Sequence, residues 1–332
     1  MHVHNFASFQ DTGWIEFSPR INLIVGQNNS GKSALLRTLN KTLSDDRHRN
    51  LARYEAIRLP RPLVEYEFDV SGSELEAAIL NSSNSVCWPV QDVGEDELKR
   101  TISSIPLLDC QFKVSRVSGA QFISANNPSH GLFDAPVHRC VILQANNGQI
   151  VRLGFGGNHE DNVVILFICI FDLKLFIFTA ERYSVGKCSI GADSRLLPNA
   201  SNLPKVLALL QGERIETFRQ LIGHVREVFS TVATISVTTL GQELEIRVWP
   251  TENTERSEWG FPLDNSGTGV AQVIAILTAM MTLEHAIIVI DEINSFFHPS
   301  AAKALLRINV LFKSSIYYCH PFSGSHQYCI GG

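Results

Sequence analysis

The stretch "INLIVGQNNSGKSALLRTL" (Ile21–Leu39) decides the fold. Its apolar beginning predicts a strand from Ile21 to Val25, and its spaced leucines predict a helix from Lys32 to about Leu43. Between strand and helix, "GQNNSGKS" (Gly26–Ser33) matches the pattern G-x-x-x-x-G-K-[ST], in which a glycine-rich loop presents backbone amides to phosphate groups. A strand, such a loop and a helix in this order predict an α/β fold built around a polyphosphate site.

Each residue type in this loop has a chemical reason to be there. Gly26 and Gly31 let the backbone turn tightly and approach phosphate oxygens. Lys32 can reach the β- and γ-phosphates of a nucleotide, and the Ser33 hydroxyl can be a ligand of Mg²⁺. The residues expected to bind the phosphates are Gly26, Gln27, Asn28, Asn29, Ser30, Gly31, Lys32 and Ser33.

A second motif ends a strand with two acids. In "HAIIVIDEINSFFHP" the run Ile287–Ile290 is apolar and leads directly to Asp291 and Glu292. At this place in a P-loop enzyme the aspartate holds Mg²⁺, and the neighbouring glutamate can orient or deprotonate the attacking water. Loops often begin with acids, so the motif gains its meaning from the phosphate loop earlier in the chain.

A third motif, "LDNSGTGVAQVIAILTAM", places Ser266, Gly267 and Gly269 at the start of an apolar helix. One interpretation is an ordinary Ser/Gly helix cap. The other is a second helix N-terminus that binds phosphate, here the γ-phosphate of a nucleotide held by another subunit. Its position shortly before the Asp-Glu strand favours the second interpretation.

The order of these motifs resembles that of ATP-binding-cassette ATPases. "NFASFQD", the phosphate loop, "FHP" after the acidic pair and "AERYSVG" (Ala180–Gly186) are similar to the SMC/RecF/OLD-like branch, often labelled AAA-type ATPases. The resemblance is close for residues 3–40 and 262–307 and loose between them.

The resemblance implies a cytoplasmic ATPase that uses ATP and Mg²⁺, with Lys32 and Glu292 as catalytic residues and Ser33 and Asp291 at the metal. It also implies a homodimer in which Ser266, Gly267 and Gly269 of one subunit cap the ATP bound at Lys32 of the other. A glutamine at the Mg²⁺ site is implied too, but no glutamine here is assigned to it. For Arg182 we favour an ordinary solvated or salt-bridged role.

Bulk properties agree with a globular protein. The chain has 332 residues, of which 45% are hydrophobic and 18% charged, and its net charge of −5 excludes a uniformly basic nucleic-acid binder. Seven cysteines without a CxxC pair, and no secretory signal at the N-terminus, favour reduced thiols in the cytosol. We expect the apolar run Val163–Phe178 to be a buried strand, since it contains Asp172 and Lys174 and is shorter than a membrane span.

The motifs near both chain ends predict a divided core. We expect a P-loop ATPase core at residues 1–60 and 231–313, a mixed α+β insertion at 61–230, and an aberrant tail at 314–332. Within these regions "LVEYEFDV" and "TISVTTLGQELEIRVWP" predict strands, Asn147-Gly148 predicts a hairpin turn, and the spacing in "ERIETFRQLIGHVREVF" predicts a helix.

In the family that the chain resembles, a strand and a "THS" turn follow the acidic strand and its helix, and the histidine of that turn senses the γ-phosphate. The sequence of the tail "SSIYYCHPFSGSHQYCIGG" contains no such pattern. With suitable codons, a shift of one base converts it to "HQYIIATHSPEVINI", which contains that turn. We therefore expect a frameshift near Lys313. The alternative is a zinc site made by Cys319, His320, His326 and Cys329, whose spacing fits no common ligand pattern.

Three functions are open from the sequence. The first is a Mg²⁺-dependent ATPase that dimerises on ATP and acts on a partner protein or nucleic acid, in DNA repair or phage defence. The second is the ATPase fragment of an OLD-like nuclease without its nuclease domain. The third is an ATP-binding module with little turnover, which the missing switch histidine favours.

Overall fold

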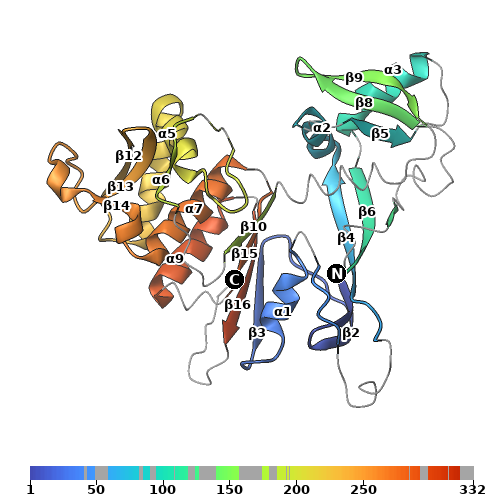
Figure 1. Ribbon diagram of the computed structural model, residues 1–332, viewed down its shortest axis with the longest axis horizontal. Helices are drawn as coiled ribbons and strands as arrows, with labels where there is room; N and C mark the ends of the chain where they lie inside the picture. Colours follow the sequence, from blue (N-terminus) through green and yellow to red (C-terminus); the bar gives the residue numbers. More distant parts are fainter. Residues whose placement is uncertain are drawn as a thin grey trace. The chain divides into compact units, whose positions relative to one another are not determined.

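A computed structural model of the chain divides into two compact units (Figure 1). Unit 1 comprises Met1–Phe17 and Arg37–Leu173, and unit 2 comprises Ser18–Leu36 and Lys174–Gly332. The structure describes residues 1–40, 43–48, 59–81, 85–89, 95–107, 109–118, 124–126, 140–156, 174–178, 185–191, 193, 195–283, 285–291, 298–312 and 314–321.

Unit 2 is built on a parallel sheet with the strand order β10-β15-β16-β3. The strands are β10 (Leu175–Phe178), β15 (Ile287–Ile290), β16 (Ser315–Pro321) and β3 (Ile21–Gly26), and each pairs in parallel with its neighbour. Parallel strands with apolar runs are buried on both faces, which matches the complete burial of Ile288, Val289 and Ile290. The predicted α/β class with a P-loop core is thereby confirmed.

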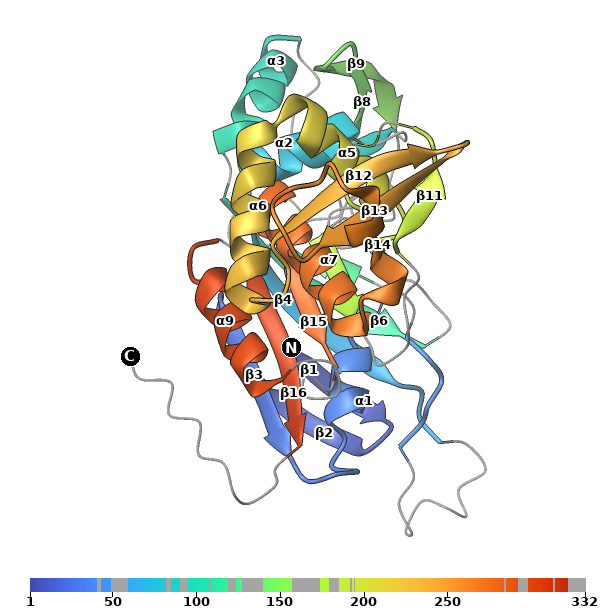
Figure 2. The ribbon, with the colours of Figure 1, turned by 90° about the vertical axis from the view of Figure 1, so that its left-hand side faces the viewer.

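Helices and a small antiparallel sheet complete unit 2 (Figure 2). The helices are α5 (Leu203–Glu213), α6 (Ile215–Val228), α7 (Thr268–Thr282) and α9 (Pro299–Asn309). The sheet has the order β11-β13-β12, with β14 on β13, where the strands are β11 (Lys187–Ser189), β12 (Thr234–Leu240), β13 (Glu243–Trp249) and β14 (Phe261–Pro262). Short 3₁₀ turns occupy Ser257–Trp259 (η2) and Leu263–Asn265 (η3).

One hydrophobic core joins these elements. It contains buried side chains from α5, α6, α7, α9 and both sheets of the unit. Helix α6 has its apolar side chains on one face, and Phe218, Leu221 and Val225 are buried there as their spacing predicts. Every residue of α7 from Val270 to Met280 is buried, so the helix that begins at the Ser-Gly motif is a central element of the unit.

Unit 1 contains two antiparallel sheets. The first has the order β2-β1-β4-β6-β7, from β1 (His2–Phe6), β2 (Phe9–Trp14), β4 (Leu63–Ser71), β6 (Asp109–Val117) and β7 (Ser124–Asn126). The second has the order β5-β8-β9, from β5 (Val86–Pro89), β8 (Cys140–Asn146) and β9 (Gln149–Gly156). Helices α2 (Gly72–Asn81) and α3 (Glu95–Ser104) and the 3₁₀ turn η1 (Ile105–Leu107) accompany them.

Most local predictions hold. The hairpin turn between β8 and β9 lies at Asn147 and Gly148, whose φ angles of 48° and 75° suit the two central positions of a hairpin turn. Strands appear where "LVEYEFDV" and "TISVTTLGQELEIRVWP" predict them. Of the apolar run Val163–Phe178, the structure describes the last residues, which form β10. Among the helices that the structure describes, none has the length and apolarity to cross a membrane.

The helix after the phosphate loop is shorter than expected. Helix α1 (Lys32–Arg37) ends six residues before Leu43. The backbone carbonyl of Thr38 accepts a hydrogen bond from the buried Tyr66 hydroxyl, and that of Asn40 accepts one from Arg116. Burial raises the pKa of Tyr66 to about 12, so the phenol stays protonated and remains a donor. Tertiary hydrogen bonds from β4 and β6 thus satisfy carbonyls just beyond the helix end.

The predicted organisation differs from these units in two ways. Residues 174–230, expected in the insertion, belong to unit 2, while most of residues 1–60 lie in unit 1. The expected core stops at residue 313, but the structure adds β16 to its sheet between β15 and β3. The functional division into core and insertion stays a prediction. The tail residues 322–332 lie outside the described part of the chain.

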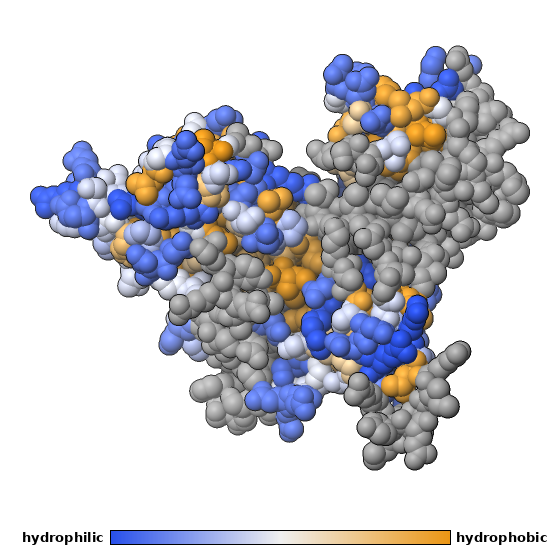
Figure 3. Space-filling model, viewed as in Figure 1, coloured by the Kyte–Doolittle hydropathy of each residue, from blue (hydrophilic) through white to orange (hydrophobic). Residues whose placement is uncertain are grey.

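The surface of the β12–β13 region shows no large apolar area on the face seen in Figure 3, where hydrophilic residues predominate and small apolar patches lie among them. Exposed apolar side chains in this region include Ile190 and Leu240. Single apolar residues of this kind are usual on protein surfaces and carry no functional meaning alone.

Replacing Leu221 with alanine tests the core around α6. Leu221 is fully buried, so we expect Leu221→Ala to lower the free energy of unfolding by roughly 2–5 kcal/mol. Ile215, the first residue of the same helix, is 44% exposed, so Ile215→Ala should lower the free energy of unfolding by less than about 1 kcal/mol. Urea unfolding followed by circular dichroism measures both, and equal losses would contradict the placement of α6.

Candidate functional site

The phosphate loop of unit 2 connects β3 to α1. Asn29 and Gly31 have positive φ angles of 65° and 92°, and the Ser30 amide donates to the Gln27 carbonyl at 3.2 Å. These conformations turn the chain back toward the helix start, where the Leu35 amide donates to the Gly31 carbonyl at 2.9 Å. Residues 27–30 are exposed, so a ligand can approach the backbone of the loop.

Gly26 is required by close packing within the loop. A Cβ atom built on Gly26 would lie 2.5 Å from the Ser30 hydroxyl oxygen and 3.7 Å from Cδ of Lys32. Real Cβ atoms essentially never make a contact of 2.5 Å, so a larger residue at position 26 would force the Ser30 side chain to shift. The first glycine of the motif therefore allows the loop to close on itself.

Lys32 lies across the loop. Its Nζ donates to the carbonyl of Gly26 at 3.0 Å and to that of Gln27 at 2.7 Å. Both acceptors belong to the loop backbone, so the ammonium group stays at the turn where the sequence predicts phosphate oxygens. A phosphate can replace these neutral carbonyls with a charge-assisted interaction, which is the stronger kind of hydrogen bond.

Ser33 and Asp291 meet although 258 positions separate them in the sequence. The Ser33 hydroxyl donates to Oδ1 of Asp291 at 3.0 Å. Ser33 is the second residue of α1, and Asp291 follows the last residue of β15. The structure therefore brings together the two oxygen groups that the sequence assigns to Mg²⁺.

The backbone also fixes Asp291. Its amide donates to the carbonyl of Phe178 at 2.9 Å, at the end of the neighbouring strand β10. The residues before it are buried in the sheet, so the end of β15 cannot shift without disturbing the core. The predicted catalytic residue Glu292 and the residue Arg182 lie outside the described residues.

A hydroxyl and a carboxylate suit Mg²⁺, a hard cation that prefers oxygen ligands and binds with few protein groups and several waters. Ser33 and Asp291 supply such a pair, and both are partly buried. The donor set of the site therefore fits the metal that the motifs imply.

The Ser-Gly motif precedes α7 as predicted. The Ser266 hydroxyl donates to the Leu263 carbonyl at 2.6 Å, which ties it to its own 3₁₀ turn. Gly267 is the N-cap of α7, with a φ of 86° that favours glycine, and it makes no side-chain cap. Gly269 lies within the first turn of α7, which begins at Thr268. The amides of this turn are thus left for another acceptor.

The structure adds a contact that the motifs do not predict. The Gly186 amide donates to Oδ1 of Asp264 at 3.2 Å, and a Cβ on Gly186 would lie 2.7 Å from that oxygen. The last residue of "AERYSVG" therefore packs directly beside the loop that leads to Ser266. Only the tertiary structure shows that Gly186 and Asp264 are partners.

The end of β16 lies beside the phosphate loop. In the parallel register His320 pairs with Val25 and Pro321 pairs with Gly26, the first residue of the motif. On its other side β16 pairs with β15, which leads to Asp291. Strand β16 therefore lies between the strands that lead to the two motifs. The alternative zinc set includes His326 and Cys329, which lie outside the described residues.

Comparisons with known proteins add a family match at the N-terminus. Residues 1–79 match the model of an AAA domain. No curated protein sequence matches the chain.

Two solved structures are similar to the chain at low identity. One is the SmcHead bound to the C-winged helix domain of ScpA, with 12% identity, a TM-score of 0.45, and coverage of 97% of this chain and 88% of that one. The other is the recombination mediator protein RecF, with 11% identity, a TM-score of 0.34, and coverage of 97% and 92%. The predicted resemblance to AAA-type P-loop ATPases is confirmed by the family match, which spans the segment carrying the phosphate loop.

Proposed function

We propose that the protein is a Mg²⁺-dependent ATPase. The observation that carries this proposal is the 3.0 Å hydrogen bond between Ser33 and Asp291. It joins the end of the phosphate loop to the end of the acidic strand, which is the arrangement that holds Mg²⁺ and the β- and γ-phosphates in P-loop enzymes. The AAA-domain match over residues 1–79 supports nucleotide binding as well.

The residues of unit 2 then have separate roles. The amides of the loop from Gly26 to Ser33 receive the phosphates, and Lys32 moves its ammonium from the loop carbonyls to phosphate oxygens. Ser33 and Asp291 hold Mg²⁺, which offsets the negative charge of the phosphates. Glu292, next to the metal ligand in sequence, orients the attacking water.

We also propose that ATP closes a homodimer. The uncapped start of α7, with Ser266, Gly267 and Gly269, would bind the γ-phosphate of the nucleotide on the other subunit. A cytoplasmic location and an action in DNA repair or phage defence belong to this proposal, with nucleic acid or a partner protein as the target. The cytoplasmic location is supported by the seven cysteines without a CxxC pair, and the pathway and target by the family resemblance.

Removing the loop lysine tests nucleotide binding. We expect Lys32→Ala to weaken ATP binding by roughly 100-fold or more, because charge-assisted hydrogen bonds worth about 3 kcal/mol in total are lost. Lys303 is an exposed lysine on α9 in the same unit, and Lys303→Ala is the control that should bind ATP normally. Isothermal titration calorimetry with Mg·ATP measures both, and normal binding by Lys32→Ala would exclude this site.

Blocking water activation tests the dimer. We expect Glu292→Gln to keep ATP affinity and to accumulate as an ATP-bound dimer, because hydrolysis no longer opens it. Adding Ser266→Arg should prevent that dimer without affecting ATP binding, since the large side chain obstructs the start of α7. Light scattering after size exclusion, with and without ATP, gives the mass. A monomeric Glu292→Gln protein in saturating ATP would contradict the sandwich arrangement.

The register of β16 favours a second candidate, an ATP-binding module with little turnover. The strand ends beside Gly26, but its last residues read Cys-His-Pro instead of the "THS" turn. His320 is the one histidine of β16. It pairs with Val25, and the next residue, Pro321, pairs with Gly26.

Phosphate release separates the two candidates. A module predicts release close to background, with no change in His320→Ala. Clear turnover that His320→Ala abolishes would show instead that His320 senses the γ-phosphate in the present reading frame. The nuclease-fragment alternative is tested at the gene, where an open frame rich in paired acids beyond the stop codon would favour it.

A further inference from the structure

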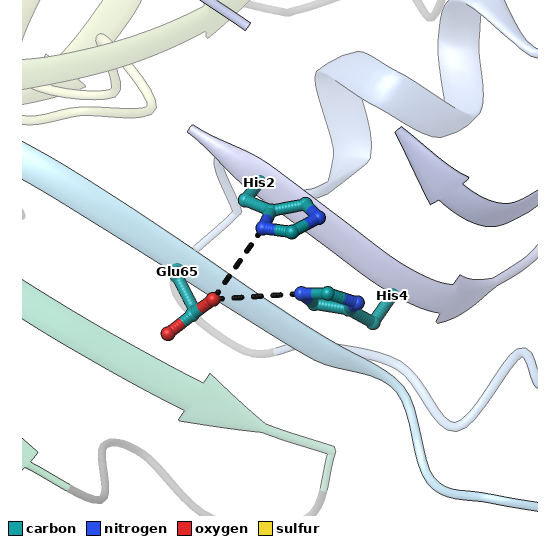
Figure 4. Close-up of side chains that lie close together, drawn as sticks. All are labelled: His2, His4 and Glu65. Atoms are coloured by element: carbon teal, nitrogen blue, oxygen red, sulfur yellow. Dashed lines mark ion pairs between the residues drawn. The ribbon is translucent and has the colours of Figure 1, made fainter. Parts of the chain in front are cut away.

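Two histidines of the N-terminal strand stand on one face of the unit 1 sheet. Successive side chains of a strand point to opposite faces, so His2 and His4 share one face while Val3, between them, is fully buried on the other. Glu65 of the neighbouring strand β4 pairs directly with His2 and therefore lies on the face of the histidines. Strand pairing thus collects two imidazoles and a carboxylate (Figure 4).

The three ligand atoms have the spacing of a metal site. Oε2 of Glu65 lies 3.5 Å from Nδ1 of His2 and 3.4 Å from Nε2 of His4. One ligand atom from each residue lies within 4.8 Å of the others. Bonds of about 2.0–2.1 Å at tetrahedral angles separate neighbouring ligand atoms by roughly 3.3–3.4 Å, so a zinc ion fits among them.

Asp11 holds His2 in the orientation that a metal requires. Nε2 of His2 donates to Oδ1 of Asp11 at 2.6 Å, and the Gly13 amide donates to the same oxygen at 2.8 Å. When Nε2 carries the proton, Nδ1 of a neutral imidazole presents a lone pair, and that atom faces Glu65. A lone pair facing a carboxylate oxygen is unfavourable unless a cation lies between them. A carboxylate behind the ligating histidine is a common arrangement at zinc sites.

An irregularity in the sheet makes this arrangement possible. The register between β1 and β2 shifts between His2, which pairs with Trp14, and His4, which pairs with Asp11. Gly13 lies at the shift with a φ of 60°, as an extra residue in a bulge often does. The shift brings Asp11 within reach of both imidazoles, since its Oδ2 lies 3.5 Å from Nδ1 of His4.

The charges balance for a divalent ion. Two neutral imidazoles with the carboxylates of Asp11 and Glu65 carry a total charge of −2. Lys113, which contacts the Trp14 ring at 4.8 Å from its centre, forms an ion pair with Glu67 at 3.9 Å. The ligand side chains are 15–23% exposed, which leaves access for the ion and for a water as fourth ligand.

We propose that His2, His4 and Glu65 bind a zinc-class divalent ion on the outer face of the unit 1 sheet, with Asp11 positioning His2. Mixed nitrogen and oxygen ligands with one open position suit Zn²⁺, and Co²⁺ can report on the same site. The ion connects β1 to β4, so it stabilises the N-terminal strand in the sheet.

Titration of the full chain, free of any histidine tag and stripped of metal by a chelator, tests the site. We expect calorimetry to show a Zn²⁺ ion bound at this site in the wild type and lost from it in His4→Gln and in Glu65→Gln. Asp11→Asn should weaken Zn²⁺ binding by roughly 10- to 100-fold, the usual effect of removing such a supporting carboxylate. Co²⁺ should give visible absorption of the four-coordinate ion in the wild type and not in the two ligand variants.

A matched control is available in unit 2. The His224 side chain is 20% exposed, and its Nδ1 lies 3.9 Å from Oε2 of Glu227. His224→Gln therefore removes a comparable histidine beside an acid, and this variant should still bind Zn²⁺ at the unit 1 cluster. Circular dichroism in chelator should show that the ligand variants are folded. Zn²⁺ binding that persists unchanged in His4→Gln and Glu65→Gln would place the ion elsewhere and overturn the proposal. Absence of Zn²⁺ binding by the wild type would overturn it too.

Discussion

The hydrogen bond from Ser33 to Asp291 depends on the parallel sheet of unit 2, and so does the rest of the site. Ser33 belongs to the helix after β3 and Asp291 to the end of β15, with β16 between the two strands. Because parallel strands place their carboxyl ends at one edge of a sheet, residues from both ends of the sequence meet there. The burial of β15 makes this edge rigid, which holds both oxygen groups at one position.

Binding and turnover make different demands on this edge. Phosphate binding needs the loop amides, Lys32 and the oxygen pair, and the structure describes all of them. The proposed turnover would also need a water positioned by Glu292 and a γ-phosphate sensor, which we expect at the end of β16. The register brings β16 to the loop, but with a sequence unlike the expected turn. Both proposed functions, an active ATPase and a binding module, therefore use the same phosphate loop.

The histidine cluster of unit 1 follows the same physical logic on an antiparallel sheet. Alternate residues of one strand share a face, and pairing adds a residue from the next strand. His2, His4 and Glu65 meet in this way, and the bulge at Gly13 adds Asp11. Ser33 and Asp291 meet because they follow the ends of parallel strands. His2, His4 and Glu65 meet because they lie on one face of two paired antiparallel strands.

The sequence by itself determined the phosphate loop, its strand and helix, the acidic strand and the start of α7, because local residue types and spacing specify each of them. It also predicted the hairpin at Asn147 and Gly148. The end of α1, the place of β16, the contact of Gly186 with Asp264 and the cluster at His2 required the tertiary structure. Each depends on which strand or loop lies next to which, and hydrogen bonds and pairings between distant segments leave no local pattern that a single sequence can reveal.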